Sequence, residues 1–286
     1  MSEPVSVLID STDGVRLAVH ELGGDGPLLL LAHATGFHGR VWEPLASHLS
    51  DAFRCVSVDF RGHGDSSPPA SGSFAWSGFA DDVDAVLDHL GRPSRCFGVG
   101  HSKGGAALLL AEQRHPGTFA GLYLFEPIVL TPEARESATQ TAGDHPLAVG
   151  ALRRREVFAS REEALGNYQA KPPLDALHPD ALAAYVDHGF ADLDDGTVRL
   201  KCRGANEAQV YSMSGGHDAF DDLDRVTCPT TVAAGALAAG SPSGFADAVA
   251  ERLPAGRLHR DDSLGHFGPL EAPELVAGRI REVFSS

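Results

Sequence analysis

The chain has 286 residues, 43% of them hydrophobic, which is enough to bury one large core or a core with an inserted segment. Its formal net charge of −16 argues against a nucleic-acid partner, because binding to phosphate needs clustered Lys and Arg, and Lys occurs only at positions 103, 171 and 201. The longest apolar runs, such as residues 28–32, are far too short to cross a bilayer. The composition therefore excludes a disordered chain and favours a small-molecule substrate over a nucleic acid or a membrane.

The cysteines and the amino terminus bear on cofactors and location. The four cysteines lie far apart and form no CxxC pair, so we expect reduced thiols, no metal and no cofactor. Residues 1–17 carry acids where a signal peptide would carry positive charge, and they lack a long apolar core. We therefore expect a cytoplasmic protein.

Short apolar runs alternate with helical patterns along most of the chain. Apolar residues from Phe79 to Leu90 share one helix face, and a second helix follows Ser102 and ends at the stop signal Pro116. The apolar runs read as strands covered by helices on both faces, which predicts an α/β protein with a mostly parallel, doubly wound sheet. The predicted strands are, in chain order, residues 27–33, 54–60, 95–101, 121–127, 230–235 and 256–262.

The alternation of short apolar runs with helical patterns is interrupted at residues 128–216. This part has charged helical stretches and no convincing buried parallel strand. We predict a helical cap there, inserted as a lid into a core formed by residues 1–127 and 217–286. Three consecutive arginines at 153–155 are expected to form an exposed helix face, with contact to an anionic substrate as the alternative.

Residues 100–104 spell GxSxG, with Ser102 at the centre, between a predicted strand and a predicted helix. A nucleophile elbow needs such a sharp strand-to-helix turn, flanked by small residues, so that the serine hydroxyl projects from the sheet. Gly105 and Ala106 extend the small-residue run. Ser102 is the predicted nucleophile, and a serine that only caps the helix is the alternative.

A serine needs a base to take its proton, and histidine suits this task because its ordinary pKa lies near neutrality. Among the 14 histidines, His266 lies on a loop between the last predicted strand and the C-terminal helix. A parallel sheet places that loop at the same edge as Ser102. His101 would point away from the turn and is expected to pack, while His63 is expected to serve its loop.

Four motifs occur in order along the chain, each at the expected point of the strand and helix rhythm: HATGFHGRVW, VDFRGHGDSS, GHSKGG and GHFGPLEAPE. On these motifs the chain resembles the α/β-hydrolase fold family over residues 5–127 and 226–286. The resemblance is specific for the fold and says much less about the substrate.

The resemblance implies an oxyanion loop at the first of these motifs. The backbone N–H groups of Thr35 and Lys103 would be its donors. The family usually has glycine where this chain has Ala34. We also expect His33 and the Lys103 side chain to contact the substrate. The Lys103 ammonium would attract an acidic substrate group, with an ion pair to a lid carboxylate as the alternative.

By the same resemblance, a triad acid should follow the fifth predicted strand, where Ala238 stands. Asp247 lies too far along, in the next helix, and the acids at 218–224 lie at the wrong end of the strand. Glu126 ends the strand after the elbow helix, and a group of haloalkane dehalogenases resembles this arrangement. We predict Glu126 as the acid, with a degenerate site or an acid from the lid as alternatives.

The leading prediction is a serine hydrolase that cleaves a small or medium carboxylic ester, thioester or lactone. An acyl-enzyme would form on Ser102, with His266 as base and Glu126 as its acid partner. One alternative uses the same residues to hydrolyse a carbon–carbon bond in a diketone-like substrate. The other is a non-catalytic binding protein on a hydrolase scaffold, for which the missing aspartate is the only support. A homo-oligomer is left open.

Overall fold

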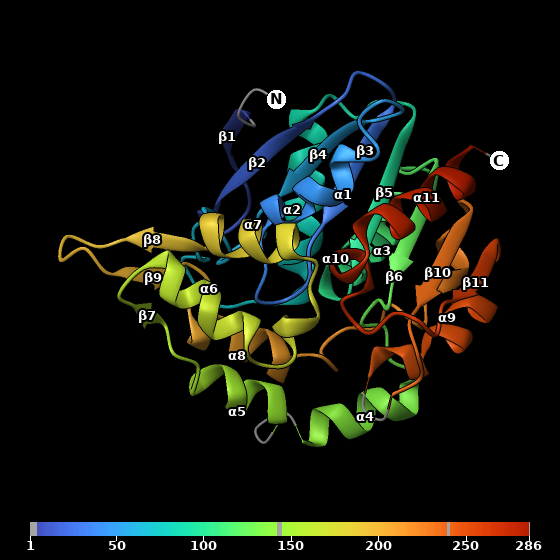
Figure 1. Ribbon diagram of the computed structural model, residues 1–286. Coiled ribbons are helices and arrows are strands. Elements are labelled where there is room, and N and C mark those ends of the chain that lie inside the picture. Colours follow the sequence, from blue (N-terminus) through green and yellow to red (C-terminus); the bar gives the residue numbers. More distant parts are fainter. Residues whose placement is uncertain (1–4, 142–144, 239–240, 286) are drawn as a thin grey trace.

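The computed structural model describes residues 5–141, 145–238 and 241–285, and its centre is an eight-stranded sheet of order β1-β2-β4-β3-β5-β6-β10-β11 (Figure 1). β1, β2 and β4 pair antiparallel, and all pairings from β4 to β11 are parallel. The predicted mostly parallel sheet is therefore confirmed. The strands are β1 (Val5–Asp10), β2 (Arg16–Gly23), β3 (Leu28–Ala32), β4 (Arg54–Val58), β5 (Cys96–His101), β6 (Gly121–Phe125), β10 (Thr230–Ala234) and β11 (Gly256–Arg260).

All six predicted strands are present, and the two N-terminal strands were not predicted. β1 lies at the edge of the sheet and is largely exposed, so its sequence lacks the continuous apolar run of a buried strand. It pairs along its whole length with β2. An edge strand of this kind gives a weaker signal in the sequence than a central one.

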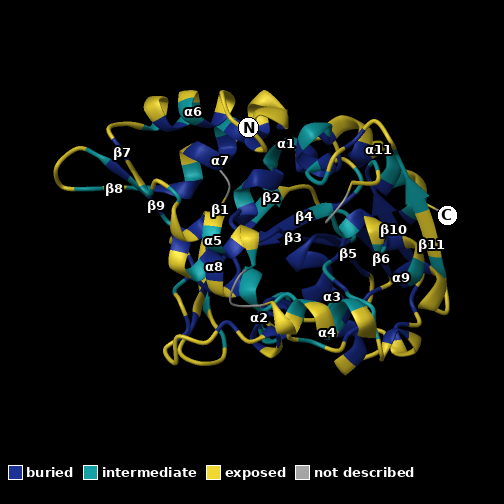
Figure 2. Ribbon diagram, turned by 90° about the horizontal axis from the view of Figure 1, so that it is seen from below, coloured by how far each residue is buried: buried dark blue, intermediate teal, exposed yellow. Residues whose placement is uncertain are grey.

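β3 illustrates how the centre of the sheet is buried on both faces. Leu28, Leu30 and Ala32 belong to one apolar core, whereas Leu29 and Leu31 belong to a second, because successive strand side chains point to opposite faces. Figure 2 shows the central strands as buried and many outer helix turns as exposed. One core includes α2 (Trp76–His89), α3 (Lys103–Arg114) and α9 (Ala246–Arg252), and the other includes α1 (Glu43–Ser47), α10 (Gly268–Glu271) and α11 (Pro273–Phe284).

Residues 128–216, here called the inserted segment, lie between β6 and β10 in the chain and are mostly helical (Figure 1). They also hold a small antiparallel sheet of order β7-β9-β8, which the sequence did not predict because its strands have only two or three residues. The elements are α4 (Pro132–Gln140), α5 (Pro146–Leu152), β7 (Val157–Phe158), α6 (Arg161–Gln169), η3 (Leu174–Ala176), α7 (Pro179–Gly189), β8 (Phe190–Asp192), β9 (Val198–Leu200) and α8 (Gly204–Ser212). Outside the segment, three short 3-10 turns are η1 (Gly39–Trp42), η4 (Leu223–Arg225) and η5 (Pro242–Gly244).

The helix face predicted for residues 153–155 is not formed, because none of the three arginines lies in a helix, and the central one is not exposed. α5 ends at Leu152, and the guanidinium of Arg154 turns inward to the carboxylate of Glu207, 2.8 Å away, and to the hydroxyl of Tyr168 at 3.4 Å. A buried cation needs such partners, because its desolvation is otherwise uncompensated. Arg153 and Arg155 are exposed, as expected.

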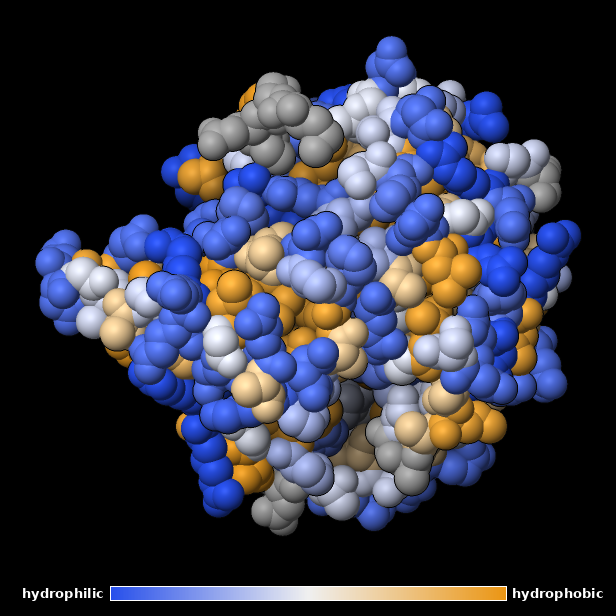
Figure 3. All heavy atoms as spheres, viewed as in Figure 1, coloured by the Kyte–Doolittle hydropathy of each residue, from blue (hydrophilic) through white to orange (hydrophobic). Residues whose placement is uncertain are grey.

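The surface and the cysteines agree with the composition. No helix within the described residues has both the length and the apolarity needed to cross a bilayer. The face shown in Figure 3 is largely hydrophilic, with apolar patches between the polar side chains. The four cysteines are buried and unpaired.

Candidate functional site

Ser102 lies at a sharp turn between β5 and α3. Its φ of 53° is in a region that costs a non-glycine residue about 1–3 kcal/mol, so the surrounding structure must enforce it. A Cβ on Gly100 would lie 2.5 Å from Gly105 Cα, and a Cβ on Gly104 would lie 2.1 Å from Ala32 O, so both positions require glycine. The Ser102 side chain makes no capping bond to α3, which removes the alternative of a mere helix cap.

His266 and Glu126 are 140 residues apart in the chain and meet at the carboxyl edge of the sheet. The Nδ1 atom of His266 lies 2.7 Å from Glu126 Oε2. Glu126 directly follows β6 and is fully buried, whereas His266 lies on the loop between β11 and α10. Because a carboxylate only accepts, Nδ1 carries the proton and Nε2 keeps its lone pair. This is the tautomer that a general base needs.

Two donors from the loop after β10 complete the surroundings of the Glu126 carboxylate. The N–H of Gly235 donates to Oε1 and the hydroxyl of Ser241 donates to Oε2, both at 3.0 Å. The backbone of Glu126 has a φ of 44°, and its N–H donates to Ala233 O at 2.8 Å. The bonds from Gly235, Ser241 and His266 give both oxygens of this buried carboxyl group a partner, which a buried polar group needs. Sequence reasoning missed Ser241, because a serine in a loop of small residues carries no distinguishing signal.

Asp247, the nearest acid after β10, takes no part in this arrangement. It lies on α9, is half exposed, and pairs with Arg260 at 2.7 Å. The backbone of Ser102 is bonded to the end of β6, directly before Glu126, because its N–H donates to Phe125 O at 3.0 Å. Among the described residues the Ser102 hydroxyl makes no hydrogen bond, and in particular none joins it to His266.

The oxyanion loop predicted after β3 packs against the first turn of α3. Within the described ranges, neither the Thr35 N–H nor the Lys103 N–H has an acceptor, as expected of donors kept for a ligand. His33 is fully buried; its Nε2 accepts from Phe60 N–H at 3.1 Å and its Nδ1 donates to Ala34 O at 2.7 Å. Both ring nitrogens are thus used to shape the loop. Substrate contact by His33 stays a prediction, and this geometry leaves it no free nitrogen.

The Lys103 side chain runs into the core beneath the elbow. Its Nζ lies 4.4 Å from the ring centre of Phe60 and 4.9 Å from that of Phe79, and it has no hydrogen-bond partner among the described residues. Burial lowers the pKa of Lys103 to about 7. The predicted ion pair with a lid carboxylate is therefore not formed, and attraction of an acidic substrate group stays a prediction.

The inserted segment contacts the oxyanion loop through polar and aromatic side chains. A Cβ on Gly36 would lie 2.6 Å from Glu207 Oε1 and 3.6 Å from Arg154 Nη1. The ring of Phe37 lies 5.2 Å from Tyr185 on α7 and 5.4 Å from Phe267, the neighbour of His266. Sequence reasoning did not identify Glu207 or Tyr185, because only the tertiary fold brings α7 and α8 over this loop.

No group of three or more His, Cys, Asp or Glu side chains in residues 5–141, 145–238 and 241–285 is arranged to hold a metal ion. The arrangement of Ser102, His266 and Glu126 can instead perform nucleophilic chemistry with side chains alone. A hydroxyl, an imidazole and a carboxylate in this order is the set that activates a serine.

Comparisons with known proteins identify the family of the chain. A family model described as the alpha/beta hydrolase family matches residues 29–279. The pimeloyl-[acyl-carrier protein] methyl ester esterase of Aromatoleum aromaticum is 30% identical over 272 residues, which cover 90% of this chain and 98% of that protein. The probable oxidoreductase EphD of Mycobacterium tuberculosis is 41% identical over 91 residues, which are 31% of this chain and 15% of EphD.

Among solved structures, the crystal structure of E-2-(acetamidomethylene)succinate hydrolase has the same fold. It superposes with a TM-score of 0.80 at 23% identity, covering 99% of this chain and 100% of that chain. This likeness shows the fold, and the family model and the similarity to the esterase show the family. The chain belongs to the alpha/beta hydrolase family.

Proposed function

We propose that the protein is a serine hydrolase that cleaves a small or medium carboxylic ester, thioester or lactone through an acyl-enzyme on Ser102. The observation that carries the proposal is the 2.7 Å contact of His266 Nδ1 with the buried Glu126, at the sheet edge where Ser102 sits on a strained turn. The esterase similarity over 90% of the chain supports an acyl substrate.

The proposed reaction has two halves. In the first, His266 Nε2 takes the Ser102 proton while Oγ attacks the substrate carbonyl, and the N–H groups of Thr35 and Lys103 hold the oxyanion. The intermediate collapses, and His266 passes the proton to the leaving alkoxide or thiolate. In the second half, His266 deprotonates a water that attacks the acyl group, which releases the acid and restores Ser102. Glu126 stabilises the imidazolium in both halves.

The inserted segment is proposed to act as a lid that selects the acyl substrate. It lies between β6 and β10 in the chain and brings Arg154 and Glu207 next to the oxyanion loop at Gly36. We propose that this ion pair meets polar parts of a substrate, whereas both ring nitrogens of His33 are used within the oxyanion loop. Hydrolysis of a carbon–carbon bond uses the same residues, and no observation favours it.

A fluorophosphonate probe and a panel of aryl esters of increasing acyl length test this proposal. We expect the probe to label Ser102 in the folded protein and the Ser102→Ala variant to lose both labelling and esterase activity. Absence of labelling in folded wild-type protein would favour the non-catalytic binding protein. Turnover of a diketone without any turnover of esters would favour the carbon–carbon hydrolase.

A further inference from the structure

Glu271, a residue with no role in the proposed reaction, holds the backbone on both sides of His266. Its Oε2 accepts the N–H of Gly265 at 2.7 Å, and its Oε1 accepts the N–H of Phe267 at 3.0 Å. Hydrogen bonds to an ionised carboxylate are roughly twice as strong as those between neutral groups. The single side chain therefore fixes the two peptide groups between which the histidine is mounted.

The close approach of Glu271 depends on glycine. A Cβ on Gly265 would lie 2.8 Å from Glu271 Oε1, so a larger residue would push the carboxylate away. The carbonyl of His266 is held as well, because it accepts a hydrogen bond from His101 Nε2 at 2.8 Å. Gly265, His266 and Phe267 thus each have one backbone group hydrogen-bonded to the side chain of Glu271 or of His101.

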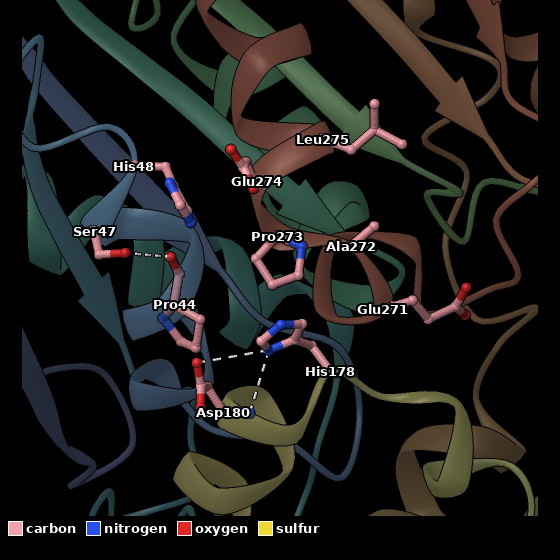
Figure 4. A pocket seen from close by; sticks show the side chains of 10 residues that line it. All are labelled: Pro44, Ser47, His48, His178, Asp180, Glu271, Ala272, Pro273, Glu274 and Leu275. Atoms are coloured by element: carbon pink, nitrogen blue, oxygen red, sulfur yellow. Dashed lines mark hydrogen bonds and ion pairs between the residues drawn. The ribbon is translucent and has the colours of Figure 1, made fainter.

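Glu271 is not one of the reacting groups and lies at the surface. It lies on the wall of a surface pocket of about 350 Å³ between α1, α7 and the start of α11. In Figure 4 its carboxylate points away from His178, which precedes α7, and from Asp180 on α7. Since the side chain is partly exposed, a substitution there has room and does not open a cavity in the core.

We propose that Glu271 is a positioning residue of the active site, which holds His266 in the orientation that serves Glu126 and Ser102 at once. This inference rests on the proposed function. Nδ1 of His266 lies 2.7 Å from Glu126 Oε2, and the proposed reaction requires Nε2 to reach Ser102 without breaking that contact, so the ring has little freedom to move. A displacement of about 1 Å in a catalytic group can cost about 100-fold in rate.

The chain supplies a matched control in Glu112. Its carboxylate accepts the N–H of Gly117 at 2.7 Å and that of Phe119 at 3.0 Å, the same two-residue spacing and distances as at Glu271. Glu112 lies near the end of α3, and the loop that it holds precedes β6, at the edge of the sheet opposite to Glu126. Loss of this clamp should lower stability without touching His266.

The test compares Glu271→Ala, Glu271→Gln and Glu112→Gln by steady-state kinetics on an aryl ester, fluorophosphonate labelling rate and thermal melting. We expect Glu271→Ala to lower kcat and the labelling rate by about 10- to 100-fold, with KM changed less than threefold. Glu271→Gln can keep one of the two hydrogen bonds, so its kcat and labelling rate should lie between those of the wild type and of Glu271→Ala. Glu112→Gln should melt at a lower temperature with kcat unchanged.

A spectroscopic signature separates positioning from simple loss of stability. The proton on His266 Nδ1, held against Glu126, should give a far-downfield proton resonance in the wild type that broadens or disappears in Glu271→Ala and persists in Glu112→Gln. Wild-type kcat in Glu271→Ala, or an equal loss of kcat in Glu112→Gln, would overturn the inference. Activity that survives Ser102→Ala would instead overturn the proposed function, whatever the Glu271 variants do.

Discussion

In most proteins that the sequence resembles, the triad acid follows the strand that corresponds to β10. Here the carboxylate and the groups that bond it come from the ends of two strands, β6 and β10. These neighbouring parallel strands are in register, with Phe125 opposite Ala233, so both end at the same edge of the sheet. The end of β6 supplies the carboxylate, Glu126, and the loop after β10 supplies its donors, Gly235 and Ser241. The two strand ends therefore meet at one carboxylate, which contacts His266.

The largest effect is expected from removing the acid itself. We expect Glu126→Gln to lower kcat by about 10³- to 10⁴-fold, as loss of a triad acid does elsewhere, because the amide cannot stabilise the imidazolium. Asp247→Asn, on the helix α9 that follows β10, is the control and should keep near wild-type turnover on the same aryl ester. Near-full activity of Glu126→Gln would show that the carboxylate comes from elsewhere.

Moving the acid back to the loop after β10 sharpens the comparison. The double variant Glu126→Gln, Ala238→Asp should have a kcat at least about tenfold higher than Glu126→Gln alone, because the histidine of the single variant lacks a correctly oriented carboxylate. The control is Ala238→Asp in the wild type, where the site already holds its acid and turnover should not rise. A double variant no better than Glu126→Gln would show that the two strand ends are not interchangeable here.

A smaller effect is expected at Ser241, which only supports the acid. We expect Ser241→Ala to lower kcat by about tenfold, since one hydrogen bond to a charged group contributes about 1.5–3 kcal/mol. Ser243→Ala, in the same loop, removes an acceptor for Ala238 N–H and leaves Glu126 bonded, so it should keep its turnover. Equal kinetics of both variants would remove Ser241 from the site.

The smallest effect on turnover is expected at Lys103, whose side chain faces neither strand end. Burial lowers its pKa to about 7 in the folded protein, whereas a lysine in an unfolded chain titrates near about 10.4. Between these values the unfolded chain binds a proton that the folded protein does not, so stability rises with pH across this window.

Lys103→Met should therefore raise the melting temperature by a few degrees at pH 6, and this gain should vanish towards pH 10. Turnover of a neutral ester should change less than threefold, because the oxyanion donor is the backbone N–H. A selective loss of activity on acidic esters would support the predicted attraction of an acidic substrate group. A gain in melting temperature that does not depend on pH would contradict the lowered pKa of Lys103.

Much of the fold could be predicted because buried parallel strands have a strong signal. The six apolar runs and the glycines around Ser102 can be recognised from a few neighbouring residues. Only small residues fit, for example, where Gly104 approaches Ala32. The edge strand β1 and the short strands β7, β8 and β9 could not be predicted, because exposure and length leave them without periodicity. The inward turn of Arg154 was missed for a related reason, since its partner Glu207 is 53 residues away.

The sequence by itself determined the order of the groups of the proposed site: a serine at a forced turn, a glutamate at the end of β6, and a histidine after the last strand. These positions follow from local rules of strand, turn and helix, which act over a few residues. Only the tertiary structure decided that Glu126 meets His266 at 2.7 Å, that Ser241 supports the acid, and that Glu271 holds the histidine loop. Hydrogen bonds between distant segments depend on how strands register and loops pack, and no local pattern in the chain encodes those distances.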